Sequence, residues 1–205
     1  MSKLKIAVVI SSTRPTRFGD KPAQWIADFA NKRDDIAAEI VDLRDYDLPL
    51  FDEMASNLWM PSANPNAVRW QNKISEFDGY IFVTAEYNRS ITGALKNALD
   101  QAYINWNKKP FGAVGYGTVG AARAVEHLRN IGVELQMVPV RSGVHIGGGD
   151  FFAVHPLGGQ NKPISAIEGS LTAGATDMLD QIAWWGAITK AQREVDASLA
   201  LQAAE

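Results

Sequence analysis

The chain has 205 residues, enough for one ordinary domain and few for two. Twenty basic and twenty-three acidic residues leave a formal charge of −3, which argues against the broad basic surface of a general nucleic-acid binder. Hydrophobic residues make up 46% of the chain and there is no cysteine, so a sizeable core is possible and a disulfide is not. No apolar run approaches the roughly 20 residues that span a bilayer, and no signal peptide is recognisable. We therefore expect a cytoplasmic protein without nucleic-acid or membrane partners.

Apolar, β-branched runs alternate with segments of helical spacing along the chain. Strands are predicted at residues 4–10, 38–43, 79–84, 111–116 and 135–140. A helical pattern follows each of the first four, and a long final helix is predicted over residues 164–200, with Trp185 and Ile188 on its apolar stripe. This alternation predicts an α/β fold with a parallel sheet covered by helices on both faces. Pro139 places the last strand at an edge of the sheet.

The glycine-rich stretch 142–163 does not fit this alternation. We expect residues 144–146 to extend the last strand. The remainder either borders a site or a subunit contact, or is a mobile surface excursion, because long structureless loops are uncommon unless functional. Trp184 and Trp185 in the final helix indicate a subunit contact, although core packing explains Trp185 equally well.

Ligands of an open parallel sheet bind beyond the carboxyl ends of its strands, which directs attention to the loops after Ile10, Thr84 and Tyr116. The first loop, residues 11–19 (SSTRPTRFG), offers hydroxyls, two guanidinium groups and free N–H groups at a helix N-terminus. These groups attract anions and predict a phosphate cradle. The sequence lacks the ending of a Walker loop. The alternative interpretation is a polar turn with solvated arginines.

The other two loops carry different chemistry. Residues 84–90 (TAEYNRS) offer an acid, a phenol and an amide that can surround a heterocycle, and Ser90 can also cap a following helix. Residues 115–120 (GYGTVG) match G-x-G-x-x-G, but they follow the fourth strand and no acidic residue ends the next strand. We therefore interpret these glycines as allowing close approach of a ligand, and not as a dinucleotide fingerprint. The three histidines show no metal-ligand spacing, so no metal site is expected.

Three segments resemble the NADPH-dependent FMN reductase family. They are residues 12–19 (STRPTRFG), 48–53 (LPLFDE) and, most specifically, 86–100 (EYNRSITGALKNALD). Tyr116-Gly117, residues 122–124 (ARA) and Leu128-Arg129 add to the likeness, which covers about residues 5–140. The resemblance implies a flavodoxin-like three-layer sandwich with a five-stranded parallel sheet of order 2-1-3-4-5 and a long C-terminal helix. It also implies that residues 1–205 form a single FMN-binding domain.

By this resemblance, the residues that match positions around the FMN phosphate are Ser12, Arg14, Arg17, Phe18 and Gly19. Those that match the loop along the isoalloxazine ring are Glu86, Tyr87 and Asn88, and those on the other side of the ring are Tyr116 and Gly117. The implied cofactor is FMN, with NADPH or NADH as co-substrate. The implied assembly is a homodimer or homotetramer.

Three residues depart from the family pattern. Ser11 stands where glycine is usual, which predicts a more crowded phosphate loop. Ala85 and Thr92 replace prolines, which predicts a looser ring loop, because each proline would have fixed one backbone angle. We therefore expect FMN to bind, with an affinity below what is typical of the family.

The implied reaction is hydride transfer from NAD(P)H through the flavin to FMN, a quinone or a similar small-molecule acceptor. Because the flavin carries the chemistry, no side chain is expected to be an indispensable acid or base. One alternative is a flavodoxin-type electron carrier without NAD(P)H turnover, against which the modest charge and the long C-terminal extension argue. The other is a non-catalytic scaffold of the same fold, which the three departures leave open.

Overall fold

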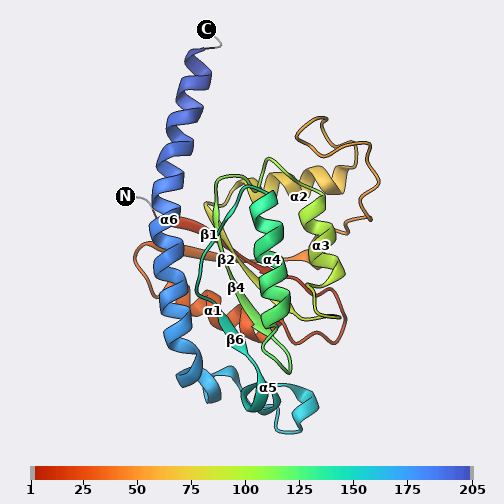
Figure 1. The fold of residues 1–205 in the computed structure, drawn as a ribbon, viewed down its shortest axis with the longest axis vertical. Helices are drawn as coiled ribbons and strands as arrows, with labels where there is room; N and C mark the ends of the chain where they lie inside the picture. Colours follow the sequence, from red (N-terminus) through yellow and green to blue (C-terminus); the bar gives the residue numbers. More distant parts are fainter. Residues whose placement is uncertain (1–2, 204–205) are drawn as a thin grey trace.

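The computed structural model describes residues 3–203 and shows a parallel sheet between two layers of helices (Figure 1). The strands lie in the order β2-β1-β3-β4-β5. Their bounds are β1 (Leu4–Ile10), β2 (Ile36–Asp42), β3 (Gly79–Ala85), β4 (Pro110–Tyr116) and β5 (Val138–Pro139). Neighbouring strands pair in parallel throughout, so the predicted flavodoxin-like sandwich with strand order 2-1-3-4-5 is confirmed.

Two short strands share the edge position beside β4. β5 pairs with the first residues of β4, and β6 (Val144–Ile146) pairs with its last three. The predicted extension of the last strand by residues 144–146 is therefore confirmed, while the strand predicted at 135–140 is only two residues long. Pro139 lies at the edge as expected, because proline has no N–H to offer a further neighbour.

Side chains of the central strands alternate between two cores. In β1, Ile6 and Val8 pack with α1 and α6, whereas Ala7 and Val9 pack with α2, α3 and α4 on the other face. The helices that form these two layers are α1 (Asp20–Asn31), α2 (Pro65–Ser75), α3 (Gly93–Asp100), α4 (Ala122–Glu134) and α6 (Glu168–Gln202). With both of its faces covered, the sheet leaves the ends of its strands as the places where loops can gather around a ligand.

The long helix α6 packs on the sheet with its first half and runs past it with its second (Figure 1). Met178 lies against Gly112 of β4, where a Cβ would come within 2.5 Å of the Met178 sulfur. Trp185 and Ile188 are 38% and 47% exposed, so their predicted place on the buried stripe is wrong. Beyond Gly186 the large apolar side chains of the helix are exposed, and the contacts of Lys190 and Arg193 with the sheet are polar. No helix within residues 3–203 is long and apolar enough to cross a membrane.

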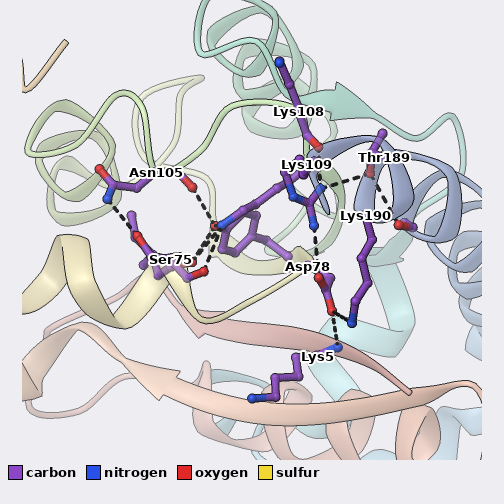
Figure 2. Close-up of polar contacts among 12 residues, drawn as sticks. Lys5, Ser75, Asp78, Asn105, Lys108, Lys109, Thr189 and Lys190 are labelled. Atoms are coloured by element: carbon purple, nitrogen blue, oxygen red, sulfur yellow. Dashed lines mark hydrogen bonds and ion pairs between the residues drawn. The ribbon is translucent and has the colours of Figure 1, made fainter. Parts of the chain in front are cut away.

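A polar cluster at the amino ends of the strands fastens α6 to the sheet (Figure 2). The Asp78 carboxylate accepts hydrogen bonds of 3.0 Å from the Lys5 N–H and from the side chains of Lys190 and Arg193. Beside it, Lys109 is only 6% exposed, and its ammonium donates to the Tyr80 hydroxyl at 3.1 Å. Burial lowers the pKa of Lys109 to about 7. This cluster lies at the opposite end of the strands from the loops that sequence analysis selected.

Candidate functional site

The loops that follow β1, β3 and β4 meet at the carboxyl end of the sheet and enclose a pocket of about 160 Å³. Eight of the ten predicted site residues line it: Ser12, Arg14, Arg17, Phe18, Glu86, Tyr87, Tyr116 and Gly117. The remaining lining residues were not predicted: Ala85, Phe151, His155 and Leu157. Phe151 comes from α5 (Gly148–Val154), Leu157 comes from the following 3₁₀ turn η2 (Pro156–Gly158), and His155 lies between the two. The glycine-rich stretch thus borders the candidate site, one of the alternatives its composition left open.

Gly19 and Asn88 do not line the pocket but shape residues that do. A Cβ on Gly19 would lie 3.0 Å from the Tyr116 hydroxyl oxygen, so the glycine lets that phenol approach the start of α1. Asn88 and Arg89 have φ values of 51° and 68°, and backbone bonds between Tyr87 and Ser90 close the turn at 2.9 and 3.0 Å. Two consecutive positive φ angles are typical of the type I′ turn, which here presents Tyr87 to the pocket.

Arg17 is held by carboxylates. Its guanidinium donates to both oxygens of Asp42 at 2.6 and 2.5 Å, to the carboxylate of Asp20, and to the Ser12 carbonyl at 2.9 Å. The hydrogen bond to Asp42 raises the pKa of Arg17 further above its usual value. The side chain is only 3% exposed. Arg17 therefore joins the loop after β1 to the end of β2 and has little charge to offer a ligand.

Arg14 differs from Arg17 in its exposure and in its partners. Its side chain is exposed, with the guanidinium 5.8 Å from the centre of the Tyr87 ring, and no carboxylate within residues 3–203 forms an ion pair with it. The Ser12 hydroxyl lies 3.5 Å from the Tyr87 hydroxyl in the same pocket. Of the two predicted phosphate arginines, Arg14 is thus the one whose charge is available to an anion.

Glu86 turns toward the start of α4. Its carboxylate accepts hydrogen bonds from the backbone N–H groups of Arg123 and Ala124, at 3.1 and 3.4 Å, and from the Arg123 side chain at 2.6 Å. Burial by itself would raise the pKa of Glu86, but these hydrogen bonds outweigh it and the pKa is lowered. An ionised carboxylate at a helix N-terminus is also favoured by the helix dipole. Glu86 therefore fixes the loop after β3 to α4.

The three departures from the family pattern have distinct structural consequences. Ser11 is fully buried, and its hydroxyl is a buried polar group without a hydrogen-bond partner among residues 3–203. Thr92 caps α3 by accepting from the Leu95 N–H at 3.2 Å, and its hydroxyl donates to the Ser11 carbonyl at 2.7 Å. A proline at position 92 could make neither bond. Ala85 ends β3 and lines the pocket.

An aromatic cluster forms one wall of the pocket. The Phe18 ring lies 5.2 Å from Tyr116, 6.1 Å from Phe151 and 5.0 Å from His155, measured between ring centres. Burial raises the pKa of the Tyr116 phenol well above its usual range, so this group stays protonated and neutral. The wall therefore carries no negative charge.

A second pocket, of about 410 Å³, lies on the other side of the loop after β1. Thr13 and Arg44 line it together with Leu48, Leu50 and the start of α3. Asn97 of α3 holds the facing loop by donating to the Pro49 carbonyl at 2.7 Å and accepting from the Phe51 N–H at 3.0 Å. The LPLFDE segment is thus positioned by side-chain hydrogen bonds in the absence of regular structure.

A family model described as NADPH-dependent FMN reductase matches residues 4–150. This chain belongs to that family. The expected class of NAD(P)H-driven flavin oxidoreductase is therefore confirmed at the level of the family. The matched range ends at residue 150 and the resemblance in the sequence near residue 140, so Phe151, His155 and Leu157 lie beyond both. The only sequence signal for these residues is the presence of two aromatic residues and a histidine in a glycine-rich stretch.

Curated relatives and solved structures agree with this assignment. An NAD(P)H-dependent FMN reductase of Nectria sp is 36% identical over 126 residues, which are 58% of this chain and 63% of the relative. A 2-hydroxy-1,4-benzoquinone reductase of Burkholderia sp is 36% identical over 143 residues, 66% of this chain and 73% of the relative. FerB, a flavoenzyme NAD(P)H:(acceptor) oxidoreductase from Paracoccus denitrificans, superimposes with a TM-score of 0.67 at 23% identity, covering 91% of this chain and 98% of FerB. The last likeness shows the fold alone.

Proposed function

We propose that this FMN reductase family member binds FMN and passes hydride from NAD(P)H through it to FMN, a quinone or a similar small-molecule acceptor. We further propose that residues 1–205 form one FMN-binding domain. The observation that carries the proposal is the convergence of eight predicted site residues, from three separate loops, on one pocket at the carboxyl end of the sheet. The names of the Nectria and Burkholderia relatives support both the donor and the acceptor class. The cytoplasmic location expected from the sequence stays a prediction.

The residues of the pocket fit the phosphate end of FMN. Arg14 supplies an unpaired cation and Ser12 a hydroxyl, while Tyr87 and Tyr116 supply aromatic surface for the ring. The 160 Å³ pocket is smaller than the roughly 300–1,000 Å³ of a typical ligand site, so it accommodates part of FMN and leaves the rest at its mouth. When bound, FMN supplies the hydride chemistry, and the protein holds and orients it.

We propose the 410 Å³ pocket for the second substrate, NAD(P)H or the acceptor. It shares the loop after β1 with the flavin pocket, since Thr13 lines one and Ser12 and Arg14 line the other. Its walls combine apolar Leu48 and Leu50 with the charged side chains of Arg44 and Asp47, which suits a ligand that has both a flat apolar ring and polar groups. Substituting Leu50, which is exposed, is expected to raise the KM for the second substrate without weakening FMN binding.

We propose a homodimer built on the second half of α6. Its exposed apolar residues are Trp184, Trp185, Ile188, Val195, Leu199 and Leu201. Several recur at spacings of four and seven residues and so form one stripe on a helix that runs past the sheet (Figure 1). Two tryptophans and four aliphatic side chains can bury on the order of 800 Å² per partner, the area of a standard interface. A second copy of α6 matches this stripe in length and polarity.

Light scattering tests the dimer directly. The unmodified protein is expected to have twice the mass of one chain, and Leu199→Glu, which touches no core residue, is expected to give a monomer with an unchanged melting temperature. A monomeric unmodified protein at tens of micromolar would contradict this interface.

Continuous turnover of NAD(P)H distinguishes the proposed enzyme from an electron carrier and from a non-catalytic scaffold. FMN-loaded protein is expected to consume NADH or NADPH continuously when a benzoquinone is supplied, as an enzyme does. A flavodoxin-type carrier would accept electrons from a reductase and leave NAD(P)H untouched. A scaffold of the same fold would not retain FMN at all. Either of these two outcomes would overturn the proposal.

A further inference from the structure

His155 is held in a fixed orientation at the pocket by three contacts. Its Nδ1 accepts a 3.1 Å hydrogen bond from the Leu157 N–H. Its ring stacks on Phe151 with 4.5 Å between ring centres and an interplanar angle of 29°, and Phe18 lies 5.0 Å away. Because Nδ1 is an acceptor, the neutral ring must carry its proton on Nε2. The structure therefore presents an N–H donor whose direction is set by packing.

Within residues 3–203, the charged groups around His155 that form no ion pair are positive. Arg14 lines the same pocket, and Lys21 of α1 lies beside the Phe18 ring and donates to Asn161 at 2.7 Å. Burial, Arg14 and Lys21 together lower the pKa of His155 below its usual value. A site with two cations and an imidazole on one side lacks a negative group.

The acidic groups near the pocket all have other partners. Asp20 and Asp42 hold Arg17, and Glu86 holds Arg123. Asp150, on the helix that ends just before His155, accepts from the Ser170 hydroxyl at 2.6 Å. Burial raises the pKa of the Tyr116 phenol, so this group stays protonated and neutral. No carboxylate among residues 3–203 hydrogen-bonds to the imidazole, which leaves a bound anion as the natural acceptor for its Nε2–H.

We propose that His155 is a phosphate-binding residue of the flavin site, whose neutral imidazole donates from Nε2 to the FMN phosphate beside Arg14. This inference rests on the proposed FMN site and adds to it a residue beyond the range that the family model matches. Because Nδ1 keeps accepting from the Leu157 N–H, the imidazole stays neutral and contributes one hydrogen bond to the phosphate, while Arg14 contributes the charge.

The imidazole keeps its protonation state when the phosphate binds. A second proton would put an N–H on Nδ1 against the Leu157 N–H, and burial, Arg14 and Lys21 already lower the pKa of His155. Riboflavin has the same ring and no phosphate, so its affinity should not depend on His155.

Two substitutions test the N–H donor at the Nε2 position of His155. In His155→Asn the shorter amide can still accept the Leu157 N–H but has no donor at the Nε2 position. In His155→Gln the amide N–H₂ reaches that position and does not titrate. His127 on α4 bonds to Ser90 at 2.6 Å and does not line the pocket, so His127→Asn is the matched control.

The test is a fluorescence titration of each variant with FMN and with riboflavin near neutral pH. We expect His155→Asn to weaken FMN about tenfold and riboflavin less than twofold. His155→Gln should recover part of the FMN affinity, and His127→Asn should match the unmodified protein. If His155→Asn keeps the FMN-to-riboflavin affinity ratio, the inference is wrong. If the unmodified protein binds no FMN, the proposed function itself fails.

Discussion

The guanidinium of Arg17 and the carboxylate of Asp42 form two parallel hydrogen bonds, of 2.6 and 2.5 Å, between the loop after β1 and the end of β2. Because of this pairing, the two arginines of the loop have different roles. Arg17 is buried and fixes the shape of the loop, whereas Arg14 is exposed and keeps its charge for a ligand. Substitutions at the two positions should therefore have different effects.

Arg17→Met should destabilise the fold, because it leaves the partly buried carboxylate of Asp42 without its cation. We expect the free energy of unfolding at pH 7 to fall by about 1–2 kcal/mol, measured by urea denaturation. Arg17 lowers the pKa of Asp42, so this contribution is present above the ordinary aspartate pKa and is lost as the pH falls through the lowered value. The variant and the unmodified protein should thus converge in acid. A constant difference down to pH 3 would contradict this account.

Arg14→Met should leave stability within about 0.5 kcal/mol, because the side chain is exposed and makes no ion pair within residues 3–203. FMN affinity should fall about tenfold or more, the cost of losing a charge-assisted hydrogen bond to phosphate. Riboflavin affinity is the control and should stay within twofold. Equal losses for both flavins would show that Arg14 contacts the ring and not the phosphate.

Thr92→Val should cost about 2 kcal/mol of unfolding free energy, because the valine can neither cap α3 nor donate to the Ser11 carbonyl. Thr92→Ser retains the hydroxyl and should retain most of the stability. Chemical denaturation of the pair at one pH checks this. Equal stabilities of the valine and serine variants would mean that the hydroxyl does not link α3 to β1.

Lys109→Met tests the buried lysine in Figure 2. Since burial lowers the pKa of Lys109 to about 7, the unfolded chain binds one proton more than the folded protein between about pH 7 and pH 10. The stability of the unmodified protein should therefore rise with pH in this range, by up to about 1 kcal/mol per pH unit. The methionine variant should lack this rise. Parallel stability curves for the two proteins would show that Lys109 remains charged when buried.

The strands and their order were predictable because the evidence for them is local. The run Leu4–Ile10 is apolar throughout because it is covered on both faces, and Pro139 indicates an edge because it lacks an N–H. The three loops could be placed near one another for a general reason, since the carboxyl ends of parallel strands meet at one side of the sheet.

What could not be predicted depends on contacts distant in the sequence. Asp42 is 25 residues from Arg17, and nothing in either segment indicates the other. His155 reaches the pocket only because residues after β6 fold back toward Phe18. The exposure of Ile188 depends on where the sheet ends, which the helical pattern of α6 does not encode.

The central claim, that this pocket holds FMN for reduction by NAD(P)H, is tested most directly by a visible spectrum. Protein is incubated with FMN, desalted, and then treated with NADPH or NADH in the absence of oxygen. The account predicts flavin bands near about 375 and 450 nm that remain with the protein and bleach on addition of the nucleotide. A colourless protein after desalting, or bound flavin that stays oxidised with both nucleotides, would contradict it.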